Sequence, residues 1–215
     1  MESTMKYGAV IAAAGLSSRM KQFKPLMEID GMSMAQRIVR NFWQLGIHDI
    51  VVVTGYCGQE LESSLKGTGA VCIRNEQYAT SQMFDSVKLG LNYMKGRCDA
   101  VFFTPVDVPL FGVETVKKLM EQKAGTVRIP VCDGFDGHPV CIQSDVIPAI
   151  LCYQGNCGLR GALQLCNADV RRIPVANPGI FLDADTQEDF AELLKFYRKE
   201  RFTHPAAMYG SAGVG

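Results

Sequence analysis

The chain has 215 residues, of which 47% are hydrophobic and 20% are charged, and its 22 basic and 22 acidic side chains give a formal net charge of zero. This composition is typical of one globular domain with a full core, and the balanced charge argues against a general surface for nucleic acid or anionic membranes. No apolar stretch is long enough to span a bilayer, and the N-terminal residues do not resemble a signal peptide. We therefore expect a soluble, cytoplasmic protein with neither nucleic-acid nor membrane partners.

The first half of the chain alternates strand-like and helix-like segments. Short apolar runs rich in β-branched and aromatic residues predict strands at 7–13, 49–55, 70–74 and 99–107. Between them, two helical stripes of apolar residues are expected to face the core: Met34, Ile38, Phe42 and Leu45, then Met83, Val87, Leu91 and Met94. This alternation predicts an α/β fold with a doubly wound, mostly parallel sheet and helices on both faces.

The second half of the chain is less regular. We expect a helix near 113–123, strands at 126–131 and 138–143, two further helical segments, a strand at 170–175 and a final helix over 187–199. Two helix starts carry capping signals, which are Ser33 with Gln36 and Thr186 with Asp189. No linker or repeat interrupts the pattern, so we predict one domain over 1–202 and a flexible tail over 203–215.

The segment AAAGLSSR, residues 12–19, directly follows the first predicted strand. Ligands of open α/β sheets bind at the carboxyl ends of the strands, so this segment is a candidate binding loop. We expect Gly15 to permit a sharp turn. Ser17, Ser18 and the exposed backbone N–H groups would then cradle anionic oxygens.

Two basic residues of this region suit phosphate. Arg19 supplies a planar guanidinium and Lys24 a mobile ammonium group five residues later. The loop is not a P-loop, because Lys21 and Lys24 lack the preceding glycine and the following hydroxyl, and its single glycine excludes a dinucleotide fingerprint. For Arg19 alone, a solvated surface cation is an equally good interpretation.

Isolated carboxylates recur at predicted strand ends. Asp107 follows an apolar strand and is flanked by prolines, while Asp183 and Asp185 follow a short strand expected near 181. Near a cationic loop, such carboxylates suggest Mg²⁺ held together with substrate phosphates. Asp185 could instead serve as a helix cap or as a partner of the helix dipole. Without metal, we expect the carboxylates of Asp107 and Asp185 to be unpaired, so that each raises the pKa of the other.

The eight cysteines show no zinc-like spacing with the three histidines, and no CxxC pair occurs among them. Several lie within apolar runs, where a thiol packs as a small hydrophobic group. We expect all of them to be reduced.

The motifs together resemble a known family. AAAGLSSRM, the Lys24-Pro25-Leu26 run, Asp30-Gly31, VVVTGY, TPVDVPL, DGHPV and FLDADTQEDF occur in the order found in MobA-like nucleotidyltransferases, most similar to the molybdenum cofactor cytidylyltransferase branch. The resemblance covers roughly residues 7–195. It implies a Rossmann-like nucleotidyltransferase fold with a small acceptor-binding subregion. It also implies transfer of a nucleoside monophosphate from a triphosphate to a phosphorylated acceptor, with release of pyrophosphate.

The same resemblance assigns roles to individual residues. Those implied to bind the nucleotide are Ala13, Ala14, Gly15, Ser18, Thr54, Gly55 and Ser81. Asn75 and Gln82 are implied to approach the base and ribose together with Ser81. Arg19 and Lys24 would be catalytic cations at its phosphates, Asp107 and Asp185 would hold Mg²⁺, and Gly137 and His138 would contact the acceptor. Three points stay open: Asp183 could replace Asp185, Ser81 could cap a helix, and His138 could be a packing residue. Relatives usually have glycine where this chain has Lys21.

The nucleotide and the acceptor are also expectations. Guanylyl-transferring relatives typically have glycine where this chain has Ala13. The alanine narrows the pocket beside the base, which favours CTP over GTP. The acceptor implied by resemblance is the molybdenum cofactor, with a cofactor-receiving enzyme as a possible partner. The alternatives are a sugar phosphate or another alcohol phosphate as acceptor, or a non-catalytic nucleotide or cofactor carrier. An ionised acceptor phosphate needs no strong general base, so catalysis would consist of positioning and electrostatics.

Overall fold

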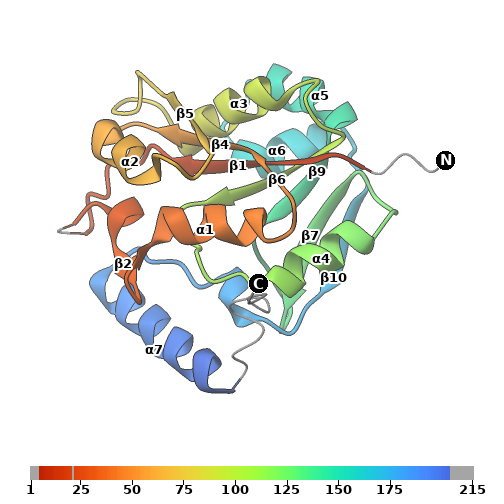
Figure 1. The fold of residues 1–215 in the computed structure, drawn as a ribbon. Helices are drawn as coiled ribbons and strands as arrows, with labels where there is room; N and C mark the ends of the chain where they lie inside the picture. Colours follow the sequence, from red (N-terminus) through yellow and green to blue (C-terminus); the bar gives the residue numbers. More distant parts are fainter. Residues whose placement is uncertain (1–4, 21, 204–215) are drawn as a thin grey trace.

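A computed structural model describes residues 5–20 and 22–203 of the chain. The central sheet has the strand order β5-β4-β1-β6-β9-β7-β10, with β8 added to β7, and a separate ribbon pairs β2 with β3 (Figure 1). The strands are β1 (Tyr7–Ala13), β2 (Glu28–Ile29), β3 (Met32–Ser33), β4 (Asp49–Thr54), β5 (Val71–Arg74), β6 (Ala100–Pro105), β7 (Val127–Cys132), β8 (Phe135–Asp136), β9 (Val140–Gln143) and β10 (Val170–Pro174). The helices are α1 (Met34–Trp43), α2 (Gly58–Leu65), α3 (Met83–Met94), α4 (Val113–Glu121), α5 (Ile147–Cys152), α6 (Gly158–Leu165) and α7 (Gln187–Thr203), with short 3-10 turns η1 (Lys24–Leu26), η2 (Ser144–Val146) and η3 (Pro178–Ile180).

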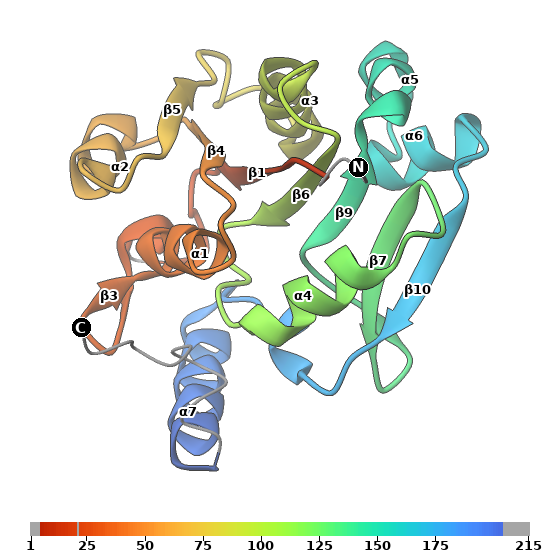
Figure 2. The same cartoon turned by 45° about the vertical axis from the view of Figure 1, so that its right-hand side comes forward.

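The parallel part of the sheet is built around β1, which lies between β4 and β6 and runs parallel to both. Its side chains alternate between two apolar cores, with Ile11 on one face and Val10 on the other. Helices α1, α2 and α4 contribute to the first core, and α3, α5 and α6 to the second (Figure 2). The predicted doubly wound α/β fold is confirmed.

The second half of the chain extends the sheet with two reversed strands, β9 and the short β8, which pairs antiparallel to β7. β9 runs antiparallel to both β6 and β7, whereas β10 is parallel to β7. Phe103 at the end of β6 pairs with Val140 at the start of β9. The residues that precede β9 therefore lie at the same edge of the sheet as the carboxyl end of β6. Helix α7 packs apart from the sheet, where Tyr197 and Leu193 contact Ile29 of the ribbon in a third apolar cluster (Figure 1).

Both predicted helix starts are confirmed. The Ser33 hydroxyl accepts a hydrogen bond from the Gln36 N–H, and the Gln36 side chain accepts one from the Ser33 N–H. At α7, the Asp189 carboxylate accepts hydrogen bonds from the N–H and the hydroxyl of Thr186. This second cap fixes the chain direction immediately after Asp185.

Two local predictions are wrong. No strand precedes Asp183, because residues 181–186 follow η3 in irregular backbone before α7 begins. Met83 is not a core residue: it is 61% exposed, since it is the first residue of α3 and projects beyond the sheet edge. The proposed tail falls outside the described residues except for Thr203, the last residue of α7.

The eight cysteines all lie in the described ranges and are free thiols, as expected. None of the helices in this part of the chain combines the length and apolar character that crossing a membrane requires.

Candidate active site

A cleft of about 360 Å³ opens at the carboxyl ends of β1 and β6. Its walls come from four segments that are distant in the sequence: the loop after β1, the connection from β5 into α3, the end of β6 and the segment before α7. The predicted site residues that line it are Ala13, Ala14, Gly15, Ser18, Arg19, Lys24, Ser81, Asp107 and Asp185. The structure therefore brings together the predicted phosphate loop and both predicted metal ligands.

The loop after β1 is held by Ser17. This residue adopts the left-handed conformation, with a φ angle of 51°, whereas Gly15 has no positive φ. The hydroxyl of Ser17 accepts a hydrogen bond from the backbone N–H of Lys24 at 3.2 Å, and its carbonyl accepts one from Met20 at 2.9 Å. The sharp turn expected at Gly15 thus occurs at Ser17. A Cβ atom at Gly15 would meet no protein atom within 4 Å, so neither backbone strain nor protein packing requires glycine at this position.

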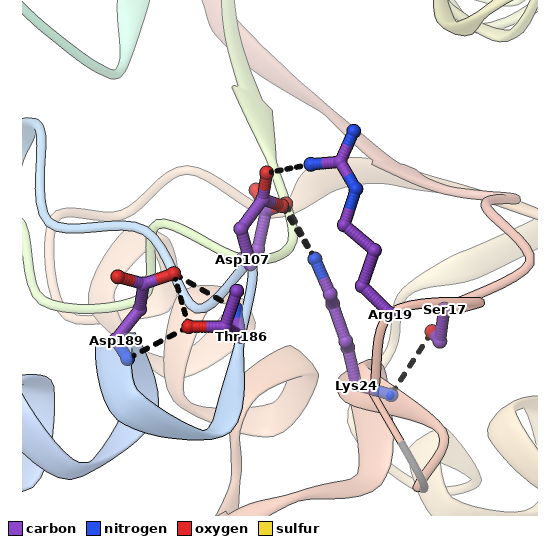
Figure 3. A network of polar contacts seen from close by, with 7 residues as sticks. Ser17, Arg19, Lys24, Asp107, Thr186 and Asp189 are labelled. Atoms are coloured by element: carbon purple, nitrogen blue, oxygen red, sulfur yellow. Dashed lines mark hydrogen bonds and ion pairs between the residues drawn. The ribbon is translucent and has the colours of Figure 1, made fainter.

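Lys24 lies between the two predicted metal ligands. Its Nζ atom is 2.6 Å from Asp185 Oδ1 and 3.6 Å from Asp107 Oδ2. Arg19 Nη1 is 2.8 Å from Asp185 Oδ2, but the Arg19 side chain is 73% exposed whereas that of Lys24 is 12% exposed. Figure 3 shows both cations reaching from the loop toward the carboxylates. Lys24 is therefore an integral part of the site, and Arg19 forms an exposed part of its rim.

The pKa values of the two carboxyl groups shift in opposite directions. The hydrogen bond from Lys24 lowers the pKa of Asp185, with further lowering by the charges of Lys24 and Arg19. Burial raises the pKa of Asp107, and the charge of Asp185 adds to that rise, although Lys24 opposes it. The expectation of two unpaired carboxylates that raise each other's pKa is thus wrong for Asp185, because the Lys24 ammonium lies between them.

Asp183 has a raised pKa, chiefly because of burial and then because of the negative charges of Asp185 and Asp107. It does not line the cleft. Of Asp183 and Asp185, only Asp185 directly contacts Lys24. The geometry favours Asp185 over Asp183 as the second cation ligand.

The opposite wall of the cleft is uncharged. It is formed by Tyr78, Ser81, Gln82, Met83 and Ser86 from the β5–α3 connection and the first turns of α3. Of these five residues, the family resemblance implied Ser81 and Gln82. A signal was present for Ser86, because a hydroxyl residue interrupts the apolar stripe between Met83 and Val87.

Ser81 does not cap α3. The N-cap is Gln82, which forms a capping box with Asp85. The Ser81 hydroxyl instead accepts a hydrogen bond from Asn75 Nδ2 at 2.8 Å. Ser81 is therefore available to the cleft, and the alternative of a capping role is wrong.

Thr54 and Gly55 do not line the cleft. Thr54 is fully buried, and its hydroxyl lies 3.2 Å from Glu62 Oε1. Gly55 packs behind the loop, where a Cβ atom would come within 2.6 Å of both the Ala14 carbonyl oxygen and Tyr78 Cβ. Their predicted direct contact with the nucleotide is not supported by this geometry. They instead support the loop and the opposite wall from behind.

Gly137 and His138 line a second cavity, of about 760 Å³, between α6 and the β9–β7–β10 part of the sheet. The His138 ring packs edge-on against Phe103 at a centroid distance of 5.6 Å, and its Nδ1 atom is buried without a hydrogen-bond partner. Burial lowers the pKa of His138 to about 4, so its imidazole is neutral near pH 7. The backbone N–H of His138 donates to the Ile180 carbonyl at 2.7 Å. His138 thus packs at the cavity wall and also helps to position the chain that leads to Asp185.

The sequence matches the model of the MobA-like NTP transferase domain over residues 9–172. The chain belongs to this family. Its cleft is therefore the candidate active site of a nucleotidyltransferase.

Comparison with individual proteins agrees with this assignment. This MobA-like chain is 28% identical over 195 residues to the molybdenum cofactor cytidylyltransferase of Escherichia coli, covering 90% of this chain and 96% of that protein. It is also similar to a nucleotidyl transferase structure from Methanothermobacter, with a TM-score of 0.78 and 21% identity over 92% of this chain and 100% of that one. A Mycobacterium tuberculosis protein solved in complex with manganese gives a TM-score of 0.72 and 19% identity over 88% of this chain and 98% of that one. These two likenesses cover most of this chain and show a shared fold.

Proposed function

We propose that this protein transfers CMP from CTP to a phosphorylated acceptor of the molybdenum cofactor type in the cytoplasm, with release of pyrophosphate. The observation that carries the proposal is the position of Lys24 between Asp107 and Asp185, beside a binding loop at the carboxyl edge of the sheet. Such a site can neutralise both a triphosphate and the cation that accompanies it. Family membership supports nucleotidyl transfer, and the E. coli relative supports cytidylyl transfer to the molybdenum cofactor.

The donor set fits Mg²⁺. Asp107 and Asp185 present hard oxygen ligands, and their contacts with the Lys24 ammonium support a site that accepts positive charge. Among the described residues there is no cluster of three metal-ligating side chains. Mg²⁺ usually has only one or two protein carboxylates and completes its shell with phosphate oxygens and water. When bound, it would neutralise phosphate charge and orient the reacting groups, with Asp107 and Asp185 as its protein ligands.

The protein groups then have distinct parts in the reaction. An oxygen of the acceptor phosphate attacks the α-phosphorus of the nucleotide, the new P–O–P bond forms, and the bond to the β-phosphate oxygen breaks. Lys24 and Arg19 offset the negative charge that develops on the departing pyrophosphate. The attacking monoester is already largely ionised near neutral pH, so no side chain has to remove a proton from it.

The acceptor would enter from the second cavity. The strand β6 connects the two spaces, since Phe103 lines the cavity and Asp107 follows the strand into the cleft. Gly137 and the neutral His138 lie at the cavity wall. Arg160 lines it as well, together with Arg172, which is paired with Asp136. A flat, partly apolar acceptor with an anionic group suits this lining.

A sugar phosphate or another alcohol phosphate is the alternative acceptor. A non-catalytic carrier that delivers a cofactor to a receiving enzyme would bind nucleotide without releasing pyrophosphate.

The experiment that tests the proposal is a pyrophosphate-release assay with CTP or GTP, with and without Mg²⁺. Molybdenum cofactor and a panel of sugar and alcohol phosphates would serve as acceptors. Pyrophosphate release that requires CTP, Mg²⁺ and the molybdenum cofactor supports the proposal. Turnover with a sugar phosphate alone would identify the alternative acceptor, and nucleotide binding without pyrophosphate release from any combination would contradict enzymatic function.

A further inference from the structure

The cleft has a charged end and an uncharged polar end. Lys24 and Asp107 lie on the side of β6, whereas Ser81 and Ser86 lie on the side of α3, and β1 separates β6 from β4 and β5 in the sheet. A triphosphate placed on Lys24 extends its nucleoside away from the charges. The base of the same molecule would then reach the end of the cleft that Ser81 and Ser86 line.

A single buried amide contacts both hydroxyls. Asn75, which is 4% exposed, directs Nδ2 to Ser81 Oγ at 2.8 Å and to Ser86 Oγ at 3.1 Å. Its Oδ1 atom accepts a hydrogen bond from the backbone N–H of Gln77 at 3.0 Å. Because a backbone N–H can only donate, this bond fixes the orientation of the amide and makes the Nδ2 side the donor to both serines.

This orientation determines what the hydroxyls can offer to a ligand. Each serine oxygen accepts a hydrogen bond from Asn75, so each hydroxyl proton is left to be donated elsewhere. Within residues 5–20 and 22–203, the structure records no acceptor for either proton. Both hydroxyls are therefore poised to donate from the cleft wall.

We infer that Asn75 is a positioning residue that selects the nucleobase by making Ser81 and Ser86 a pair of hydrogen-bond donors. The base that suits them presents two adjacent acceptors, as cytosine does with O2 and N3. Uracil presents one acceptor and one donor at the same two positions, and guanine presents two donors at N1 and N2. This inference rests on the proposed function and adds a physical basis for its preference for CTP.

The decisive variant is Asn75→Asp. It keeps the size of the side chain and the acceptor for Gln77, but a carboxylate oxygen replaces the donor that faces the serines. The two hydroxyl protons then turn toward Asp and expose oxygen lone pairs to the cleft. We expect CTP affinity to fall about tenfold to a hundredfold, because cytosine then meets two mismatched groups. UTP keeps one match and one mismatch, so its affinity should change little.

Equilibrium binding of CTP, UTP and inorganic tripolyphosphate, measured by calorimetry with Mg²⁺ and without acceptor, provides the test. A structural effect of the substitution would weaken all three ligands together, whereas the inference requires a lower CTP-to-UTP affinity ratio with unchanged tripolyphosphate affinity. Asn92→Asp is the matched control, since Asn92 lies on the exposed side of α3. An unchanged CTP-to-UTP ratio in folded Asn75→Asp protein would overturn the inference.

If Asn75→Asp does not fold, Ser81→Ala and Ser86→Ala decide the matter, because neither introduces a buried charge. Each should lower CTP affinity about tenfold and leave tripolyphosphate binding unchanged. Unchanged CTP affinity in both serine variants would also overturn the inference. If the wild-type protein transfers nucleotide but the variants bind CTP as tightly as it does, only the base-selection role is refuted. If the wild-type protein binds none of the three ligands, the proposed function itself is refuted.

Discussion

Lys24 is held in place by the fold and also carries the ammonium group that we propose meets the nucleotide phosphates. Its ammonium is mostly buried and bonded to Asp185 in the absence of substrate, and its backbone is tied to Ser17. When a triphosphate enters the cleft, the same ammonium is the positively charged group best placed to meet it. A role at the departing pyrophosphate, where charge builds up during the reaction, would affect rate more than binding.

Lys24→Ala should therefore lower kcat on the order of a hundredfold or more while weakening CTP binding much less. Steady-state kinetics with varied CTP, together with calorimetric affinities, would separate the two effects. Lys95→Ala, which alters an exposed lysine after α3, is a suitable control. A folded Lys24→Ala enzyme with a near-native rate would show that Lys24 is only a structural cation.

Asp107→Asn and Asp185→Asn should both abolish Mg²⁺-dependent turnover but differ in stability. Asp107 has a pKa raised by burial, so its neutral amide should leave the metal-free protein as stable or slightly more stable. Asp185 has a pKa lowered by Lys24, so its loss should cost up to about 1 kcal/mol, a small value because the side chain is 40% exposed.

The stabilisation from Asp185 is present above its unfolded-state pKa and is lost as pH falls through its lower folded-state pKa. Urea unfolding between pH 2 and pH 7 would measure both effects. Equal destabilisation by the two variants, with turnover retained in Asp107→Asn, would place the cation elsewhere.

His138 should give a separate dependence of stability on pH. Its folded-state pKa of about 4 lies below the ordinary histidine value of 6.5, so the unfolded chain binds more protons between these two values. The free energy of unfolding should therefore rise with pH across this window, by up to about 3 kcal/mol. Wild type and His138→Asn would be compared by urea unfolding from pH 4 to pH 7. The same slope in both proteins would show that His138 is not the group responsible.

At the scale of elements, the contact of α3 with β1 brings the two walls of the cleft together. Gly90 in α3 faces Val10 in β1 so closely that a Cβ atom at Gly90 would overlap the Val10 side chain. No larger residue fits without moving the helix. Because α3 carries Ser86 and β1 leads into the binding loop, this spacing also determines the width of the cleft.

Gly90→Ala should destabilise the protein by about 1–3 kcal/mol and weaken CTP binding. Urea unfolding and calorimetry would measure the two effects. Asn92→Ala, on the exposed side of the same helix, should change stability by less than about 0.5 kcal/mol. Native stability and affinity in Gly90→Ala would show that α3 can shift without affecting the cleft.

The sequence predicted the elements better than their detailed contacts. Period-two and period-3.6 patterns located the main strands and helices, and short capping motifs at Ser33 and Thr186 located two helix starts. Adjacent parallel strands end at one edge of the sheet, which is why the loop cations and Asp107 could be placed together in advance.

The remaining features depend on three-dimensional neighbours that a linear pattern does not specify. Thr54 is buried behind the loop, because a residue at the end of a strand can face either side of the sheet. The left-handed turn at Ser17 and the exposure of Met83 depend on how α3 and the loop approach each other across the sheet edge. The sequence placed Asp185 near the cationic loop, but it did not predict the direct contact of Asp185 with Lys24, because a linear pattern does not specify which side chains meet.

At the scale of the whole molecule, the cleft exists only when four distant segments are folded together. A nucleotide should therefore bind the folded state and not the unfolded chain. At a concentration one hundred times its Kd, such a ligand adds about 2.7 kcal/mol to the free energy of unfolding. For a domain of this size, this corresponds to a rise in Tm on the order of 5–10 °C.

CTP with Mg²⁺ should raise the Tm by this amount, whereas the same ligand with Lys24→Ala should raise it less. Thermal melts followed by circular dichroism, over a series of CTP concentrations, would measure the shift. A Tm that stays constant up to millimolar CTP would contradict nucleotide binding in the cleft.

The ion pairs of Lys24 also bear on the sequence of binding events. The ammonium of Lys24 occupies the space between Asp107 and Asp185. A metal ion that bound there without nucleotide would have to displace this ammonium group. A triphosphate that arrives with its metal supplies new negative charge for that ammonium at the same moment. At the proposed magnesium site, this arrangement would favour ordered assembly, in which metal and nucleotide arrive as one complex.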